Sequence, residues 1–181
     1  MIIWVNGAFG SGKTTLVAEL HRRLPAALVL DPEQVGFLLR GIVDVPTGDF
    51  QDLRLWRQQT AGLAAGLWQE YNRPVLVPMT LVDAGHLAEI FTALENAGTP
   101  LHHFFLRVPP DVLARRIDAR TVAPHDPERD RAARAWCRAQ VGRCVAAADF
   151  MPPGTVFLDG ERPCRDLADE VLVRVGSGMR G

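Results

Sequence analysis

Residues 2–15 read IIWVNGAFGSGKTT, and this short stretch decides the fold. Its first four residues are apolar and rich in β-branched side chains, which predicts a buried strand over 2–5. The eight residues from Gly7 to Thr14 satisfy the pattern G-x-x-x-x-G-K-[ST], and a helical pattern starts directly after them. A strand, a glycine-rich loop and a helix in that order are the context in which this pattern forms a phosphate-binding loop.

The predicted loop offers several kinds of contact to a nucleoside triphosphate. Its backbone N–H groups can turn inward around phosphate oxygens, because glycine adopts backbone angles that other residues avoid. Lys13 can bridge the β- and γ-phosphates, and the Thr14 hydroxyl can bind Mg²⁺. We therefore expect ATP and Mg²⁺ as cofactors, with nucleotide contacts from Gly7, Ala8, Phe9, Gly10, Ser11, Gly12, Lys13, Thr14 and Thr15.

Lys13 is the single lysine of the chain, which has 19 arginines. A codon bias toward arginine explains the imbalance, but it does not explain the exception. A phosphate-binding loop needs a compact ammonium on a flexible stem, which the planar guanidinium of arginine does not reproduce. The position of this one lysine therefore supports the interpretation of the loop.

Apolar, β-rich runs alternate with longer helical patterns along the rest of the chain. We predict strands at 2–5, 27–30, 74–78, 103–108 and 155–158. Helical patterns cover 16–24, 35–42, 52–71 and 111–120, and an amphipathic segment follows a loop at 121–127. This alternation predicts an α/β fold with a five-stranded parallel sheet and helices on both faces, a P-loop NTPase similar to nucleoside monophosphate kinases. We expect one domain over 1–175 and a flexible tail at 176–181.

The second predicted strand runs directly into Asp31, Pro32 and Glu33. We place this strand beside the P-loop strand, where an acid at the carboxyl end of a parallel strand lies in the ligand crevice. Asp31 could then orient a substrate hydroxyl and accept its proton. Asp-Pro-Glu is also a good helix start, so a role of Asp31 as N-cap stays open, and one residue can do both. Glu33 is interpreted as a cap partner or a complement to the helix dipole.

Eight arginines lie between 115 and 143, against four acidic residues, and they predict a local anion site. Arg116 and Arg120 are four residues apart on one predicted helix, so they should point the same way. Their spacing resembles the arginine pair of adenylate-kinase-like lids, in which one arginine stacks on adenine and the other reaches the transferring phosphate. We predict a mobile arginine lid over 116–140; a solvated helix face is the alternative. A second stripe could add a phosphate contact: Arg131, Arg134 and Arg138.

Three further positions are candidates because of their place in the chain. Arg40 ends the second predicted helix, where related kinases hold the phosphoryl acceptor, although it could simply complement the helix dipole. Asp159 and Gly160 follow the last strand, where such kinases hold adenine; a turn is the alternative. Asp83 could reach Mg²⁺ through water, because the third strand ends without the usual acid.

Composition excludes several classes of protein. Hydrophobic residues make up 48% of the chain and charged residues 23%, which is typical of one soluble domain. The net charge of -1 argues against a nucleic-acid partner and against a polybasic membrane anchor. No uncharged stretch reaches the roughly 18 residues of a transmembrane helix, and the three cysteines lack metal or disulfide spacing. We therefore expect a cytoplasmic protein without a transmembrane segment.

Several short motifs together resemble the tunicamycin-resistance protein family. They are the loop and its strand at 1–14, LHRRL at 20–24, DPE at 31–33, WR at 56–57 and VPMT at 77–80. The resemblance covers the first half of the chain well and the second half more loosely. It implies an ATP-dependent phosphotransferase that moves the γ-phosphoryl group to a hydroxyl of tunicamycin, a lipid-tailed uridine nucleoside antibiotic, and so confers resistance.

The resemblance also implies where the acceptor binds. A helical region over 32–72 would hold it, with Asp31 and Arg40 near the reacting groups. Trp56 could stack on a flat ring and Arg57 could meet a phosphate or a carbonyl, although a core position for Trp56 is the preferred alternative. Two other functions stay open: sequestration of the drug without chemistry, and a housekeeping nucleoside or metabolite kinase. Monomer, homodimer and contact with a membrane surface through the lipid tail are open as well.

Overall fold

The computed structural model describes residues 1–178. Five parallel strands form one sheet in the order β2-β3-β1-β4-β5. The strands are β1 (Ile2–Gly7), β2 (Leu28–Val29), β3 (Val75–Pro78), β4 (Leu101–Arg107) and β5 (Val156–Asp159). All five strands that the sequence predicts are present, so the predicted α/β fold class is confirmed.

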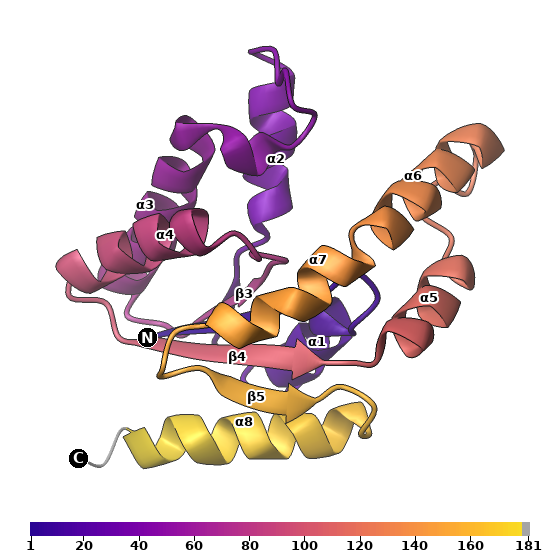
Figure 1. Cartoon of the computed structure of the whole chain (residues 1–181). Coiled ribbons are helices and arrows are strands. Elements are labelled where there is room, and N and C mark those ends of the chain that lie inside the picture. The colour runs from indigo at the N-terminus through magenta and orange to yellow at the C-terminus, as the bar shows by residue number, and fades with distance from the viewer. Residues whose placement is uncertain (179–181) are drawn as a thin grey trace.

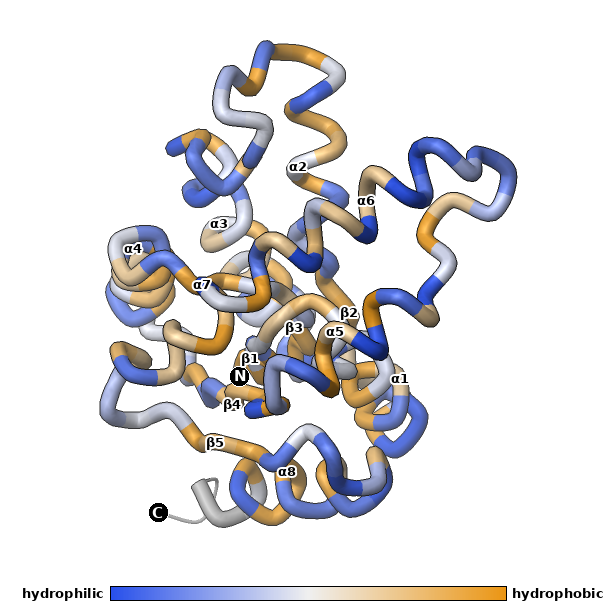
Figure 2. Tube along the Cα trace, turned by 45° about the vertical axis from the view of Figure 1, so that its right-hand side comes forward, coloured by the Kyte–Doolittle hydropathy of each residue, from blue (hydrophilic) through white to orange (hydrophobic). Residues whose placement is uncertain are grey.

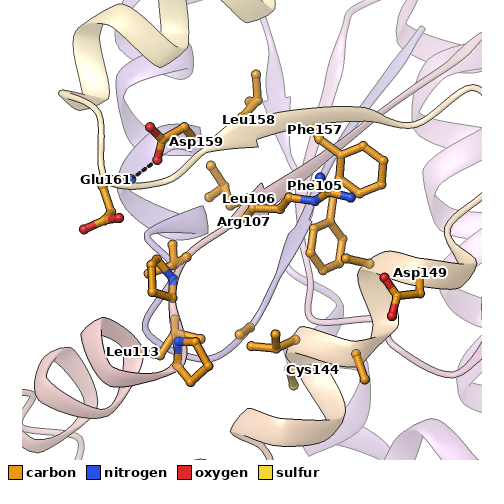
Figure 3. A pocket seen from close by; sticks show the side chains of 17 residues that line it. Phe105, Leu106, Arg107, Leu113, Cys144, Asp149, Phe157, Leu158, Asp159 and Glu161 are labelled. Carbon is orange, nitrogen blue, oxygen red and sulfur yellow. Dashed lines mark hydrogen bonds between the residues drawn. The ribbon is translucent and has the colours of Figure 1, made fainter.

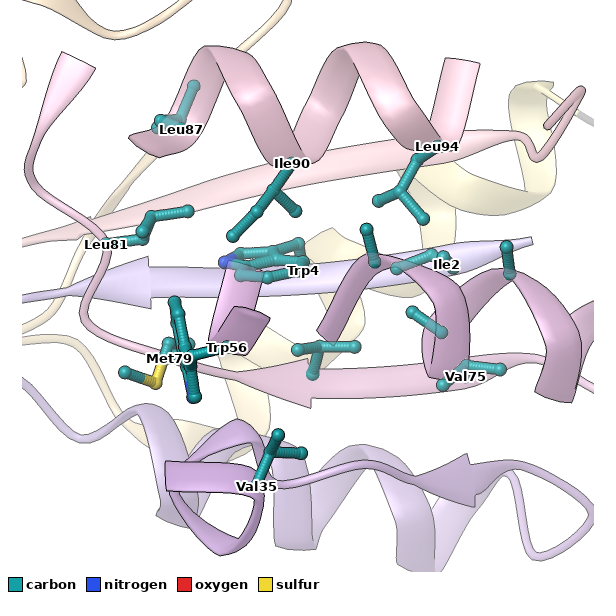
Figure 4. Packing of buried hydrophobic residues seen from close by; sticks show 14 of the residues in the cluster. Ile2, Trp4, Val35, Trp56, Val75, Met79, Leu81, Leu87, Ile90 and Leu94 are labelled. Carbon is teal, nitrogen blue, oxygen red and sulfur yellow. The ribbon is translucent and has the colours of Figure 1, made fainter. Parts of the chain in front are cut away.

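The central strand β1 is buried along its whole length because helices cover both of its faces. Ile2 and Trp4 point into one apolar cluster, whereas Ile3 and Val5 point into another. Figure 4 shows Trp4 beneath Ile90 and Leu94, which belong to the helix at the top of the view. A strand covered on both faces reads as a continuous apolar run rather than as an alternating one, which explains the sequence at 2–5.

The helices form a layer on each face of the sheet (Figure 1). On one face lie α1 (Lys13–Arg23) and α8 (Cys164–Gly178), whose apolar residues pack in the cluster of Ile3 and Val5. The other face carries α3 (Arg54–Tyr71), α4 (Ala84–Asn96) and the short α7 (Val141–Ala146). Within residues 1–178, no helix is both long enough and apolar enough to cross a membrane.

Two arms rise from the carboxyl edge of the sheet. One contains α2 (Pro32–Arg40) and the 3-10 helix η1 (Phe50–Asp52); the other contains α5 (Pro110–Asp118) and α6 (Pro127–Ala139). Hydrophilic residues dominate the outer end of the second arm, as Figure 2 shows for the start of α6. A second 3-10 helix, η2 (Ala147–Phe150), leads from α7 back to β5.

The predicted position of β2 beside β1 is wrong. Strand β3 pairs with β1 from Ile2 opposite Val75 to Val5 opposite Pro78, and β2 pairs only with β3 at the edge of the sheet. The physical reason is length: a strand of two residues is too short to pair along β1, whereas the four apolar residues of β3 can do so.

The predicted apolar face of the second helix is only half correct. Val35 and Leu39 are buried, but Leu38 is 64% exposed and Ile42 is 69% exposed. The helix projects from the sheet and ends at Arg40, so that Ile42 lies beyond it.

Two helices were not predicted, although both carry helical spacing. Leu87, Ile90 and Leu94 form the buried side of α4, and Leu167, Ala168, Val171 and Val175 form that of α8. Because α8 continues to Gly178, the predicted flexible tail at 176–181 is wrong for its first three residues. Its last three residues, 179–181, lie outside the described residues.

Candidate active site

The glycine-rich loop between β1 and α1 has the backbone that its sequence requires. Gly12 has φ 100° directly before α1, a conformation that side chains rarely allow. At Gly7, φ is 143°, and a Cβ there would lie 2.8 Å from Ser11 Oγ and 3.0 Å from the Leu106 carbonyl oxygen. Both glycines are therefore needed for the shape of the loop.

The ammonium of Lys13 lies inside this loop. Nζ donates to the carbonyl oxygens of Gly7 at 2.9 Å and Ala8 at 2.8 Å, and it lies 5.7 Å from the centre of the Phe9 ring. Burial lowers the pKa of Lys13 to about 8, although the nearby Cys144 and Glu33 oppose this shift. A desolvated cation without a paired carboxylate is stabilised by an anion, which suits a phosphate site.

Buried polar groups fix the loop to the end of β3. Asn6 Oδ1 accepts from the backbone N–H of Gly7 at 2.7 Å and of Leu81 at 2.9 Å, while its Nδ2 donates to the Leu81 carbonyl at 2.7 Å. Thr80 Oγ1 donates to the Gly7 carbonyl at 2.9 Å, and Ser11 N donates to the Ala8 carbonyl at 3.1 Å. We did not predict the roles of Asn6 and Thr80 from the sequence. The signal was a polar residue at the end of each of two buried strands.

A cleft of about 600 Å³ opens over the loop and brings the predicted residues together. It is lined by Gly10, Gly12, Lys13, Thr14 and Thr15 of the loop and α1, and by Asp31, Glu33, Arg116 and Arg120 from the two arms, among others. Two carboxylates and three cations thus share one site. Such convergence of charges in a cleft is typical of functional sites.

Asp31 lies in this cleft although β2 is an edge strand. The carboxyl ends of parallel strands lie on one edge of the sheet, and Asp31 lies there between the end of β2 and the start of α2. Asp31 also caps α2, because its Oδ1 accepts from the backbone N–H of Glu33 at 3.0 Å. The capping role is therefore present, and the carboxylate lines the cleft at the same time.

Glu33 also lines the cleft, in addition to the capping role that the sequence predicts for it. Its carboxyl pKa is raised, first by desolvation and then by the neighbouring Asp31 carboxylate, while Lys13 and Arg120 oppose the shift. These four charges therefore interact, and Glu33 can share a proton-accepting role with Asp31.

Arg116 and Arg120 both reach the cleft, but they do not share a helix. Helix α5 ends at Asp118, so Arg120 lies beyond it, and the prediction of one helix through Arg120 is wrong. Arg116 donates to the Gly160 carbonyl at 3.1 Å. A smaller cavity of about 290 Å³ lies beside this contact, lined in part by Gly12, Thr15, Arg116 and Gly160.

The loop after β5 closes this smaller cavity. Gly160 N donates to the Arg107 carbonyl at 2.8 Å, and a Cβ at Gly160 would lie 2.5 Å from Val108. Asp159 Oδ1 accepts a hydrogen bond from Glu161 N at 3.0 Å, so Asp159 stabilises a turn, as the alternative interpretation expects. Asp159 does not line the smaller cavity. Of this predicted pair, only Gly160 lines the smaller cavity.

Arginines of the second stripe form ion pairs within the second arm, which contains α5 and α6. Asp130 is buried, accepts from Val122 N at 2.6 Å and Ala123 N at 3.0 Å, and pairs with Arg134 at 3.0 Å. Arg138 forms an ion pair with Asp118. Arg134 and Arg138 are therefore held within the arm, and the lining of the cleft does not include Arg131, Arg134 or Arg138.

Three residues expected to hold the acceptor do not line the cleft. Trp56 is 0% exposed, and its Nε1 donates to the Pro32 carbonyl at 2.9 Å. Arg57 pairs with Glu89 at 2.6 Å and donates to the Gln51 carbonyl, while Arg40 binds the Gly48 carbonyl and lies over the Phe50 ring. In the structure these long side chains hold the 32–72 region together, and Trp56 has the core position that was the preferred alternative.

Trp56→Ala should lower the free energy of unfolding by about 3–5 kcal/mol, because it leaves a cavity in the main apolar cluster. Urea unfolding followed by circular dichroism measures this loss. Leu63→Ala on the exposed side of the same helix is the matched control and should change stability by about 0.5 kcal/mol or less. A stable Trp56→Ala protein with weakened acceptor binding would contradict the core role.

Asp83 does not reach the phosphate cleft. It caps α4 by accepting from His86 N at 3.0 Å, and it lies 3.9 Å from Arg143. No cluster of three or more metal-ligating His, Cys, Asp or Glu side chains occurs in the described part of the chain. The Thr14 hydroxyl in the cleft nevertheless fits Mg²⁺, which needs few protein ligands when phosphates supply the others.

A cavity of about 720 Å³ lies on the other side of the loop after β5 (Figure 3). Its lining is mostly apolar, and the Arg107 guanidinium lies 3.8 Å from the centre of the Phe157 ring. None of Lys13, Asp31 and Arg120 lines it. The phosphate cleft, although smaller, is therefore the candidate active site.

Comparison with protein families agrees with this geometry. The family model described as AAA domain matches residues 2–143, from β1 to α7. The chain belongs to this AAA domain family. An adenylyl-sulfate kinase of Myxococcus xanthus is 29% identical to this chain over 119 residues, which are 64% of this chain. The match spans 62% of the length of that relative.

Solved structures confirm the P-loop kinase fold of this AAA domain. The tunicamycin resistance protein of Deinococcus radiodurans is 23% identical, with a TM-score of 0.73 over 97% of this chain and 95% of that one. An APS kinase of Mycobacterium tuberculosis, in complex with AMPPNP and APS, is 21% identical, with a TM-score of 0.66 over 97% and 96%. A gluconokinase of Sinorhizobium meliloti is 17% identical, with a TM-score of 0.63 over 98% and 94%. The expected resemblance to the tunicamycin-resistance fold is thus confirmed.

Proposed function

We propose that this protein is an ATP-dependent phosphotransferase that moves the γ-phosphoryl group to a hydroxyl of a nucleoside-type antibiotic such as tunicamycin. The observation that carries the proposal is the convergence of Lys13, Asp31, Arg116 and Arg120 on one cleft above a phosphate-binding loop. In this cleft Asp31 follows the edge strand β2 and does not end the strand beside β1. A phosphotransferase needs such a carboxylate, because it must also activate an acceptor.

Each residue has a defined part in the transfer. Asp31 accepts the proton of the acceptor hydroxyl as its oxygen attacks the γ-phosphorus, and the bond to the β-phosphate oxygen breaks to release ADP. Lys13 and Arg120 stabilise the charge on the transferring group, where such cations are most effective. Arg116 and the Gly160 backbone hold the base in the smaller cavity. Thr14 would hold Mg²⁺, which shields the phosphate charges when bound.

The class of acceptor is supported by the similarity in fold to the tunicamycin resistance protein. A metabolite kinase is the second candidate, because the relative found by sequence is an adenylyl-sulfate kinase. The three cysteines are free thiols, which supports a reducing compartment such as the cytoplasm.

Incubation with Mg²⁺, [γ-³²P]ATP and tunicamycin tests the proposal. We expect labelled drug on a thin-layer plate, and expression should raise the tolerance of growing cells to tunicamycin. Adenylyl sulfate and gluconate serve as alternative acceptors in parallel reactions. Retained drug binding without label would instead favour sequestration, and label in another acceptor alone would favour a metabolite kinase.

The affinity for ATP should fall by roughly tenfold between pH 7.5 and 9, because Lys13 loses its proton near pH 8 and only the charged form attracts phosphate. The contribution of Lys13 to the free energy of unfolding should instead increase with pH. Since the folded pKa lies below the unfolded value of 10.5, the unfolded chain holds more protons between pH 8 and 10.5, and this group makes unfolding harder as pH rises. Titration with a fluorescent ATP analogue at each pH measures the affinity. An equally steep pH dependence in Lys13→Met would contradict the assignment.

A further inference from the structure

His103 on β4 is a buried titratable side chain that the proposed transfer does not use. It is 6% exposed, and burial lowers its pKa to about 4, so the ring is neutral at neutral pH. On one side its ring meets the Phe91 ring of α4 edge to face, with ring centres 4.9 Å apart. A polar ring buried in this way needs hydrogen-bond partners, and His103 has one at each ring nitrogen.

These two partners connect His103 to the phosphate-binding loop. Nδ1 lies 2.8 Å from the hydroxyl of Thr155, directly before β5, and Nε2 lies 3.3 Å from Nδ2 of Asn6. Asn6 is the 0% exposed side chain that binds the backbone of Gly7 at the start of the loop and of Leu81 after β3. His103 therefore contacts the residue that fixes the loop, although it lies outside the cleft itself.

The hydrogen bonds of Asn6 determine which nitrogen of His103 carries the proton. The amide atom that faces the N–H groups of Gly7 and Leu81 must be the oxygen, so the atom that faces His103 is the NH₂ group. Because a donor cannot donate to another donor, Nε2 is the unprotonated nitrogen of the neutral ring. Its one proton is then on Nδ1 and points to the Thr155 hydroxyl.

With His103 in this tautomer, the Asn6 side chain uses its full hydrogen-bonding capacity. Its oxygen accepts from two backbone N–H groups, and its NH₂ group donates to the Leu81 carbonyl at 2.7 Å and to His103 Nε2. The sulfur of Met151, 3.9 Å from Nδ2, is a weaker acceptor beside them. A half-turn of the amide would place donors against donors at Gly7 and Leu81, so only one orientation satisfies every partner.

We infer that His103 is a positioning residue for the phosphate-binding loop: as a hydrogen-bond acceptor it holds the Asn6 amide in the orientation that fixes Gly7 and Leu81. This inference rests on the nucleotide-binding part of the proposed function. A loop that is ordered before the nucleotide arrives loses less conformational entropy on binding. Changes in a hydrogen-bonded chain of this kind alter affinity by roughly 2- to 30-fold.

The proton position is tested first, by a long-range ¹⁵N–¹H spectrum of the histidine rings. His103→Gln assigns the signals, because those of His103 disappear from the five histidines of the chain. Between about pH 6 and 8, Nδ1 of His103 should carry the proton and Nε2 should not. A ring protonated at Nε2 would overturn the inference, because it could not accept from Asn6.

The positioning role is tested by calorimetric titration with AMPPNP and Mg²⁺, which needs no turnover. His103→Phe keeps a ring beside Phe91 but removes the acceptor, so the affinity should fall by roughly 2- to 30-fold. His103→Gln carries an amide oxygen that can accept from Asn6 Nδ2, and it should restore most of the affinity. Equal affinities in the unsubstituted protein and His103→Phe would overturn the role.

Phe91→Leu is the matched control for packing. It removes the ring that meets His103 and leaves the chain from Thr155 to Asn6 intact, so urea unfolding should begin earlier while AMPPNP affinity stays the same. A loss of affinity as large as that of His103→Phe would show that His103 acts through packing alone.

Failure of the phosphotransferase looks different from failure of the positioning role. If the unsubstituted protein binds AMPPNP and the affinities follow the expected order, but no acceptor is ever labelled by [γ-³²P]ATP, His103 keeps its role and the phosphotransferase does not stand. If labelling proceeds and His103→Phe binds AMPPNP normally, the reverse holds. If the unsubstituted protein does not bind AMPPNP, both are overturned.

Discussion

Lys13→Met should abolish phosphoryl transfer, lowering turnover by roughly 10³-fold or more, because it removes the cation placed to meet charge that develops on the γ-phosphate. Binding of ATP should weaken as well, since the ground-state phosphates lose the same contact. The measurement is label transfer from [γ-³²P]ATP at saturating nucleotide, with ATP affinity from calorimetry. Folding should not suffer: the lowered pKa shows that the buried ammonium is unfavourable in the free protein, and methionine fills a similar volume.

Lys13→Arg is the matched variant, and it should also fail. Nζ reaches two carbonyl oxygens inside the loop as a compact donor, and the wider planar guanidinium cannot occupy that space. Substantial activity in Lys13→Arg would show that charge alone is sufficient at this position. Full activity in Lys13→Met would remove the loop from the mechanism altogether.

Asp31→Asn should lower turnover by roughly 10²- to 10⁴-fold while leaving ATP affinity nearly intact, because it removes a proton acceptor and keeps the shape of the side chain. Asparagine caps helices as well as aspartate does, so α2 should keep its start and the free energy of unfolding should change little. The measurement is the rate of label transfer at saturating ATP and acceptor.

Comparison with Asp31→Ala separates the two roles of this residue. Alanine cannot accept from Glu33 N, so this variant should lose about 1 kcal/mol of stability in addition to the activity. If Asp31→Asn keeps full turnover, Asp31 acts only as a cap, and Glu33→Gln becomes the decisive variant because Glu33 lines the same cleft.

Local patterns were sufficient for much of the fold. The strand at 2–5, the glycine-rich loop and the helix after it follow from residues that are neighbours in sequence, and Lys13 could be assigned with them. The order of the strands could not, because it depends on how β3 competes with the two-residue β2 for the edge of β1. A sequence shows the apolar run of each strand but not its partner.

Local sequence also does not show which side chains of the acceptor region are buried. Trp56 and Trp136 are both tryptophans on helices, and nothing in their immediate neighbours separates a buried indole from an exposed one. Packing decides: Trp56 lies in the main apolar cluster, whereas Trp136 is half exposed and meets the Phe9 ring edge to face. Arg57 likewise became a structural residue because Glu89, 32 positions away, lies beside it.

The carbonyl oxygens that hold Lys13 each have a second donor. Gly7 also accepts from Thr80 Oγ1, and Ala8 also accepts from Ser11 N. When the ammonium leaves both oxygens for a phosphate, neither becomes an unsatisfied buried acceptor, which would otherwise cost about 1–3 kcal/mol each. The lysine can therefore exchange partners with a small reorganisation energy, and the loop keeps its shape while its cation moves.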